Sequence, residues 1–199
     1  MKVLFASVAT FALSIGAAFA APEIGAPAPA FTGTTTSGDT VSLSDLAGEK
    51  VILEWTNHDC PFVKKHYEAG NMQMTQEAAA EAGYTWLTII SSAPGKQGHV
   101  SAEMADELTE TRDASPTHVI LDESGEIGTA YAAKTTPHMY IIDEEGTLVY
   151  AGGIDSIPSA DKADLEKAEN YVLAAMENIE AGEPVATPQS QPYGCSVKY

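Results

Sequence analysis

The sequence has 199 residues, with 28 acidic and 10 basic side chains, a net charge of −18 and two cysteines. This length corresponds to one domain that can bury a sizeable core. An acidic excess of this size is repelled by phosphate backbones, so we expect no nucleic acid partner.

The first twenty residues have the layout of a secretory signal peptide. Lys2 precedes an apolar stretch, and residues 18–20 read Ala-Phe-Ala. The stretch is short and rich in small residues, and no later run approaches the roughly 18 apolar residues of a membrane span. We therefore exclude residues 1–20 from the fold. We expect an exported, periplasmic protein without stable membrane insertion.

Strand and helix patterns alternate along the rest of the chain. Residues 21–40 are rich in Pro, Gly and Thr, which predicts an extended segment with turns and short strands. Residues 42–50 predict one helical turn. Further along, the patterns predict strands at 51–56, 84–92 and 117–122, a helix at 60–82 interrupted near Gly70, a helix at 101–112 and a short helix at 126–133.

The second half of the chain begins with a β-hairpin. Residues 138–143 and 147–152 are strand-like, and the turn between them is acidic and ends in Gly146. Apolar residues at helical spacing predict one long amphipathic helix over 159–181. The C-terminal arm, residues 183–199, contains three prolines and little periodicity, so we expect an extended arm and not a packed element.

This order predicts an α/β fold in which a central mixed sheet has helices on both faces, with an N-terminal extension and the C-terminal arm added. Helical connections imply parallel pairing among the early strands, and the hairpin adds an antiparallel edge. We expect one domain over residues 21–182, since neither an internal repeat nor a linker is present.

Cys60 lies between a strand and a predicted helix start. Pro61, which follows it, is favoured in the first turn of a helix because its missing N–H would be unpaired there. The thiol then faces the positive end of the helix dipole, and Lys64 lies one turn on. Both lower the pKa of a cysteine and Asp59 raises it, so we predict a lowered pKa. The plainer interpretations are a buried small apolar side chain and half of a structural disulfide.

Glu54 interrupts the apolar run of the same strand. An unpaired carboxylate is costly to bury, so one interpretation is an edge residue that faces water. The other is a buried carboxyl group beneath Cys60, whose raised pKa allows it to pass protons during thiol chemistry.

Three stretches resemble the peroxiredoxin-like redoxins, the AhpC/TSA-like branch of the thioredoxin superfamily. They are EWTNHDCPFVKKHY at 54–67, TTPHMYIID at 135–143 and PVATPQSQPYGCSVKY at 184–199. The resemblance implies a thioredoxin-like fold over the whole mature chain. It also places Glu54 at the position of the acidic residue found six residues before the first active cysteine of thioredoxins.

The resemblance further implies a substrate-binding loop next to Cys60. On local evidence alone the Thr136–Pro137 bond is expected to be trans, because only about 5–6% of X–Pro bonds are cis. The thioredoxin-like proteins instead have a cis-proline there, which would bring the Thr136 backbone against Cys60 to pair with an incoming peptide or disulfide. We count Pro61 with Thr136 and Pro137 as substrate-binding.

The chain departs from the proteins that it resembles at several chemically important positions. The active cysteine is followed by Pro61, Phe62 and Val63, so the C-x-x-C of thioredoxins is absent. Peroxiredoxins carry Pro and Thr seven and three residues before their cysteine, where this chain has Leu53 and Asn57. Its only arginine, Arg112, lies in a predicted helix. These losses weaken a peroxidase assignment, because peroxide reduction needs hydrogen-bond donors that stabilise the negative charge developing on the peroxide oxygens.

Cys195, in the C-terminal arm, is the candidate partner of Cys60. Two cysteines in an oxidising compartment make one disulfide the default expectation. We favour an exported thiol–disulfide oxidoreductase in which Cys60 is the nucleophile, Cys195 the resolving cysteine and Glu54 a catalytic carboxyl group. A static Cys60–Cys195 staple is the competing interpretation.

The expected partners are protein or small-molecule disulfides and thiols, with a membrane-linked thiol reductase as a candidate. We expect no cofactor. Two alternative functions are a thiol peroxidase and a copper or zinc protein. The metal hypothesis rests on the type of side chain and not on a recognised ligand spacing. The side chains that suit copper or zinc are His58, Cys60, His66, His138 and Cys195.

Overall fold

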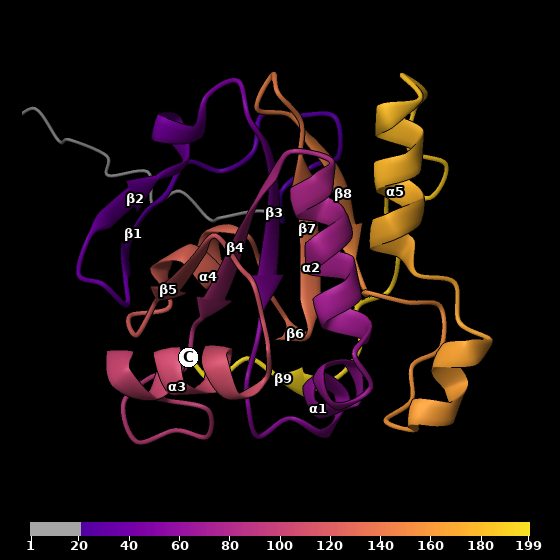
Figure 1. Cartoon of the computed structure of the whole chain (residues 1–199). Coiled ribbons are helices and arrows are strands. Elements are labelled where there is room, and N and C mark those ends of the chain that lie inside the picture. Colours follow the sequence, from indigo (N-terminus) through magenta and orange to yellow (C-terminus); the bar gives the residue numbers. More distant parts are fainter. Residues whose placement is uncertain (1–20) are drawn as a thin grey trace, which may run out of the picture.

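The computed structural model describes residues 21–199, so the predicted signal peptide lies outside the described residues (Figure 1). The strands are β1 (Thr32–Thr35), β2 (Thr40–Ser42), β3 (Lys50–Trp55), β4 (Tyr84–Ile90), β5 (His118–Leu121), β6 (Thr135–Thr136), β7 (His138–Ile142), β8 (Leu148–Gly152) and β9 (Cys195–Ser196). The helices are η1 (Leu43–Leu46), α1 (Pro61–Glu68), α2 (Asn71–Glu81), α3 (Ala102–Thr111), α4 (Glu126–Ala130), η2 (Lys162–Glu166) and α5 (Tyr171–Glu180). Over this part of the chain, no helix is long and apolar enough to cross a bilayer.

A seven-stranded mixed sheet forms the centre of the molecule, in the order β2-β1-β5-β4-β3-β7-β8. β3, β4 and β5 pair in parallel, whereas β7 pairs antiparallel with both β3 and β8. The predicted parallel pairs and antiparallel hairpin are therefore confirmed. Because side chains alternate along a strand, Ile52 and Glu54 of β3 point to one face of the sheet, and Val51, Leu53 and Trp55 point to the other.

Helices cover both faces, as expected for this fold class. One face packs against α1, α2 and α5, through a cluster that includes Ile52, Trp86, Met139 and Ile141 of the sheet and Val63, Met72, Val172 and Ala175 of the helices. Figure 1 shows α2 and α5 side by side on this face. The other face packs against α4 through Leu53, Trp55, Ile120 and Tyr140 with Ile127 and Tyr131. The predicted thioredoxin-like fold is confirmed.

The predicted interruption near Gly70 separates α1 from α2. Gly70 has a φ of 73°, in the left-handed region where a residue without Cβ is favoured. An alanine-rich run then continues as α2. The break allows α1 to lie at an angle to α2, near β6 and β9, while α2 runs along the face of the sheet (Figure 1).

The prediction of one long helix over 159–181 is wrong. Residues 162–166 form the short 3₁₀ helix η2, and α5 begins only after Asn170. The Asn170 side chain accepts hydrogen bonds from the Val172 and Leu173 amides and so caps α5, and its backbone forms a β-bridge with Asp155. Apolar residues at helical spacing begin at Leu165 and predict a continuous helix. The pairing of Asn170 with Asp155 overrides that preference and starts α5 later.

The C-terminal arm is packed against the rest of the molecule, contrary to expectation. β9 pairs antiparallel with β6, and Figure 1 shows it beside β6 and α1. Tyr193 is 9% exposed, and the Tyr199 hydroxyl donates to the Ala133 carbonyl. Sequence periodicity does not reveal this docking because the contacts are made residue by residue with distant backbone groups.

Candidate active site

Cys60 lies at the carboxyl end of β3, where the loop 56–59 turns into α1. It is the N-cap residue of α1, and Pro61 occupies the first helical position as predicted. Its carbonyl accepts from the Lys64 amide, which closes the first turn of the helix. The side chain is 0% exposed. The sulfur therefore lies at the positive end of the α1 dipole, yet it is covered from solvent.

The structure brings Cys60, Cys195, Thr136 and Pro137 together. In the β6–β9 pair, Thr136 lies opposite Cys195. The Cys195 amide lies 3.4 Å from the Cys60 Sγ, and the Cys60 thiol donates to the Thr136 carbonyl at 3.0 Å. Both cysteines are free thiols in this structure. The Thr136–Pro137 bond is cis, so the trans expectation from local evidence is wrong and the bond implied by the family resemblance is confirmed.

The two thiols have opposite pKa shifts. Burial raises the pKa of Cys60, but hydrogen bonds to its sulfur more than offset burial and lower that pKa overall; they come from the Cys195 thiol and from the Val63 and Cys195 amides. For Cys195, burial and the interaction with Cys60 raise the pKa to about 11. Cys60 is therefore the thiol of the pair that loses its proton more readily. The predicted lowering is confirmed, although exposed Lys64 is not among its main causes.

Replacing Cys195 by alanine should raise the pKa of Cys60, because the strongest hydrogen bond to its sulfur is lost. At a fixed pH below that pKa, alkylation of Cys60 should slow in proportion to the lost thiolate. The ultraviolet absorbance of the thiolate, followed against pH, measures the shift. Cys195→Ser is the matched control, since a hydroxyl keeps a donor at the same place; equal pKa values in the two variants would contradict the assignment.

Glu54 is buried and does not face water. It is 0% exposed, and its carboxylate accepts hydrogen bonds from the side chains of Tyr67, Gln76, Trp86 and Thr88. Burial raises the pKa of Glu54, and these hydrogen bonds only partly oppose that effect. Within residues 21–199 no hydrogen bond joins Glu54 to Cys60. The carboxyl group is thus on the same face of the sheet as α1. Any proton that it exchanges with the thiols must pass through other polar groups or water molecules.

A small cavity lies between Glu54 and the loop before Cys60. It has a volume of about 30 Å³ and is lined by Tyr67 and Thr88, which both hydrogen-bond Glu54, and by residues of the loop. This volume holds about two water molecules. The Thr56 hydroxyl, on the cavity wall, is buried and has no hydrogen-bond partner in the part of the chain that the structure describes. The cavity thus adjoins two of the side chains that hydrogen-bond Glu54 and reaches the loop before Cys60, although neither Glu54 nor Cys60 lines it.

Arg112 does not act on the Cys60 sulfur. Its guanidinium lies over the Tyr67 ring, 4.8 Å from the ring centroid, and donates to the His58 carbonyl at 3.2 Å. Asn57 holds the loop by donating to the Gln97 carbonyl. The arginine thus stabilises the loop, and its positive charge opposes the rise in the pKa of Glu54.

Two of the candidate histidine ligands make other contacts. His66 hydrogen-bonds Tyr193, and burial lowers the pKa of His66 to about 4. His138 is buried next to Tyr140, with a pKa lowered to about 3 by burial and by nearby Lys134. Within the part of the chain that the structure describes, no three histidine, cysteine or acidic side chains form a metal-binding group. The copper or zinc hypothesis therefore gains no support.

Sequence reasoning missed several residues that hold Cys195 in place. Gly194 has a φ of +127°, and a Cβ added there would lie within van der Waals overlap of the Thr136 carbonyl oxygen. Gly194 therefore lets the arm approach β6 closely. The Gly-Cys dipeptide was the available sequence signal, because glycine next to a functional residue often marks close backbone approach. Tyr193 and Asp155 carried no such signal.

A family model described as the AhpC/TSA family matches residues 24–151. Among solved structures, an uncharacterized conserved protein from Geobacillus kaustophilus is 26% identical with a TM-score of 0.73, covering 89% of this chain and 92% of that chain. A hypothetical protein from Sinorhizobium meliloti 1021 is 23% identical with a TM-score of 0.72, covering 90% and 96%. The pneumococcal exposed lipoprotein thioredoxin from Streptococcus pneumoniae is 28% identical with a TM-score of 0.50, covering 69% and 96%. No curated protein matches the sequence.

Proposed function

Because the chain belongs to the AhpC/TSA family, a redoxin branch of the thioredoxin superfamily, we propose that it is a thiol–disulfide oxidoreductase with Cys60 as nucleophile and Cys195 as resolving cysteine. One observation carries this proposal. Cys195 lies opposite Thr136 in the β6–β9 pair, and its amide is 3.4 Å from the Cys60 Sγ. The pKa of Cys60 is lowered and that of Cys195 is raised. A thiolate nucleophile and a neighbouring protonated thiol are the two components that disulfide exchange requires.

The reaction proceeds in two exchange steps. The Cys60 thiolate attacks one sulfur of a substrate disulfide, forms a mixed disulfide and releases the first substrate thiolate. Cys195 then loses its proton and attacks the Cys60 sulfur, which forms the Cys60–Cys195 disulfide and releases the second thiolate. The two thiolates take up the two protons that the cysteines gave up. Two electrons pass from the protein to the substrate. A reduced donor dithiol reverses the sequence: it reduces the Cys60–Cys195 disulfide and becomes a disulfide itself.

Glu54 supports proton transfer in this scheme. Its raised pKa keeps part of the population protonated nearer neutral pH than an ordinary carboxyl group. The cavity beside Tyr67 and Thr88 links its surroundings to the loop before Cys60. We place Glu54 as a proton reservoir that acts through water, with Thr136, Pro137 and Pro61 forming the substrate side of the site.

The arm must move for an external disulfide to reach Cys60. The Cys60 side chain is 0% exposed, and the arm pairs with the Thr136 backbone, which an extended substrate would use. A substrate therefore displaces β9, and the return of β9 delivers Cys195 to the mixed disulfide. The static staple uses the same two cysteines but requires no such movement.

We also propose that the protein works in the periplasm. The signal-peptide layout of residues 1–20 supports export, and one similar solved structure is that of an exposed lipoprotein. An oxidising compartment favours a cycling disulfide pair. Partners there would be protein or small-molecule disulfides, with a membrane-linked thiol reductase as the electron donor.

Equilibration with glutathione tests the proposal. Purified protein should exchange fully between dithiol and Cys60–Cys195 disulfide across buffers of mixed reduced and oxidised glutathione, and mass spectrometry of alkylated samples counts the free thiols. Cys195→Ser should accumulate a mixed disulfide with glutathione on Cys60, and Cys60→Ser should serve as the unreactive blank. A disulfide that glutathione never reduces would establish the staple. Rapid oxidation by hydrogen peroxide, beyond that of an ordinary thiolate, would establish the peroxidase.

A further inference from the structure

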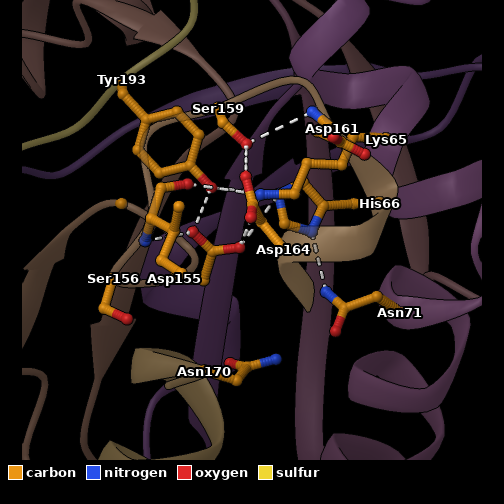
Figure 2. A network of polar contacts seen from close by, with 12 residues as sticks. Lys65, His66, Asn71, Asp155, Ser156, Ser159, Asp161, Asp164, Asn170 and Tyr193 are labelled. Carbon is orange, nitrogen blue, oxygen red and sulfur yellow. Dashed lines mark hydrogen bonds and ion pairs between the residues drawn. The ribbon is translucent and has the colours of Figure 1, made fainter. Parts of the chain in front are cut away.

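A buried polar cluster joins the C-terminal arm to the helix that carries Cys60 (Figure 2). We call it the Asp155 cluster; it consists of Lys65, His66, Asn71, Asp155 and Tyr193. The Lys65 and His66 side chains are 0% exposed and that of Asp155 is 2% exposed. Ionised groups are costly to bury unless they are paired and hydrogen-bonded, so each member needs its partners.

The hydrogen bonds of the cluster run in one direction. The Asn71 side-chain amide lies 2.8 Å from the His66 Nδ1 and donates to it, which leaves the proton of the neutral ring on Nε2. The His66 Nε2 then donates to the Tyr193 hydroxyl at 3.2 Å, and that hydroxyl donates to Asp155 at 2.5 Å. Lys65 donates to the other Asp155 oxygen at 3.0 Å. Figure 2 shows Asp155 between Lys65 and Tyr193.

Both sides of the thiol pair are attached to this cluster. Lys65 and His66 belong to α1, whose N-cap is Cys60, and Tyr193 precedes Cys195 by two residues. The Tyr193 ring also packs edge-on against Phe62, with 5.8 Å between ring centroids. Asp155 thus fixes the arm relative to α1 at a point two residues before Cys195.

We propose that Tyr193 is a positioning residue, which holds Cys195 against Cys60 through its hydrogen bonds to Asp155 and His66. The inference rests on the proposed function and adds a determinant of how fast Cys195 resolves a mixed disulfide. An apolar ring alone would fill the same space against Phe62 but would not fix the arm's direction. The hydroxyl adds that direction, because one oxygen must accept from His66 and donate to Asp155 at once.

Tyr193→Phe tests the inference because it removes only the hydroxyl and keeps the ring contact. Losing a hydrogen bond to a charged acceptor should shift the arm's closing equilibrium about tenfold toward the open form. In the Cys195→Ser background, alkylation of Cys60 by a bulky maleimide should therefore become about tenfold faster. With Cys195 present, closure of the Cys60–glutathione mixed disulfide should become slower by a similar factor, measured by rapid quench and mass spectrometry.

Tyr84→Phe is the matched control. Tyr84 is buried in the same core cluster, and its hydroxyl has no hydrogen-bond partner within residues 21–199. Both rates should therefore stay at the wild-type values. Thermal unfolding shows whether each variant folds. A merely structural role predicts that Tyr193→Phe lowers stability while both rates stay unchanged, which would overturn the inference. Failure of the proposed function is separate, because the wild-type mixed disulfide would then not close at all.

Discussion

Replacing Gly194 by alanine should detach the C-terminal arm from Cys60. A Cβ at this position would overlap the Thr136 carbonyl oxygen, and its φ of +127° is strained for any residue with a side chain. Strain and overlap together disfavour the closed arm by roughly 3 kcal/mol or more, which corresponds to at least about a hundredfold in the closing equilibrium. Maleimide labelling of Cys60 should accelerate, and closure of the mixed disulfide should slow, each by about that factor.

Gly182→Ala is the control for this change. Gly182 also has a positive φ, of +70°, but a Cβ there would meet no atom within 4 Å. The control variant therefore has a strained backbone next to the arm but no collision. Its rates of maleimide labelling and of mixed-disulfide closure should stay within about twofold of wild type. If Gly194→Ala left Cys60 as protected as in the wild type, the arm could not be the element that covers the thiolate.

Replacing Glu54 by leucine should destabilise the protein by about 3–5 kcal/mol, measured by denaturant unfolding. The change leaves the buried donors of Tyr67, Trp86 and Thr88 without their acceptor. Glu54→Gln is the matched variant: it keeps one acceptor oxygen and should lose much less. Equal losses in the two variants would show that the carboxylate is not what satisfies these donors.

The pH dependence of the same two proteins gives a second test of Glu54. Its pKa is raised by burial above the ordinary 4.5, so the folded state binds the proton more tightly than the unfolded state. The resulting stability is fully present below about pH 4.5 and is lost as pH rises through the folded pKa. Relative to Glu54→Gln, the wild type should therefore become less stable across that range as the pH increases.

Local patterns predicted the framework that places Cys60. The apolar run of β3, Pro61 at the first helical position and Gly70 between α1 and α2 all act through neighbouring residues, so the sequence shows them directly. The family resemblance added the cis bond at Pro137, which local evidence argued against. The sequence did not decide whether Glu54 faces solvent or the core, because its burial depends on hydrogen-bond donors from β4, α1 and α2.

The contacts that bring Cys195 to Cys60 could not be predicted in this way. Tyr193 meets His66 and Asp155 across 127 and 38 residues of sequence, and each of these residues alone looks like an ordinary surface group. The wrong prediction of one helix over 159–181 has the same origin. Asn170 pairs with Asp155, and this long-range contact sets the point at which α5 begins. Single-sequence patterns describe local preference and do not contain such long-range pairings.

The docking of β9 makes the way in which residues 195–199 are held depend on the redox state of the two cysteines. In the dithiol, residues 195–199 are retained by hydrogen bonds such as those from the Val197 amide to the Lys134 carbonyl and from the Ala93 amide to the Lys198 carbonyl. In the proposed Cys60–Cys195 disulfide, the same segment would be tied covalently to the start of α1. Cleavage of the chain between residues 183 and 194 would then release β9 from the reduced protein but leave it attached through sulfur in the oxidised protein.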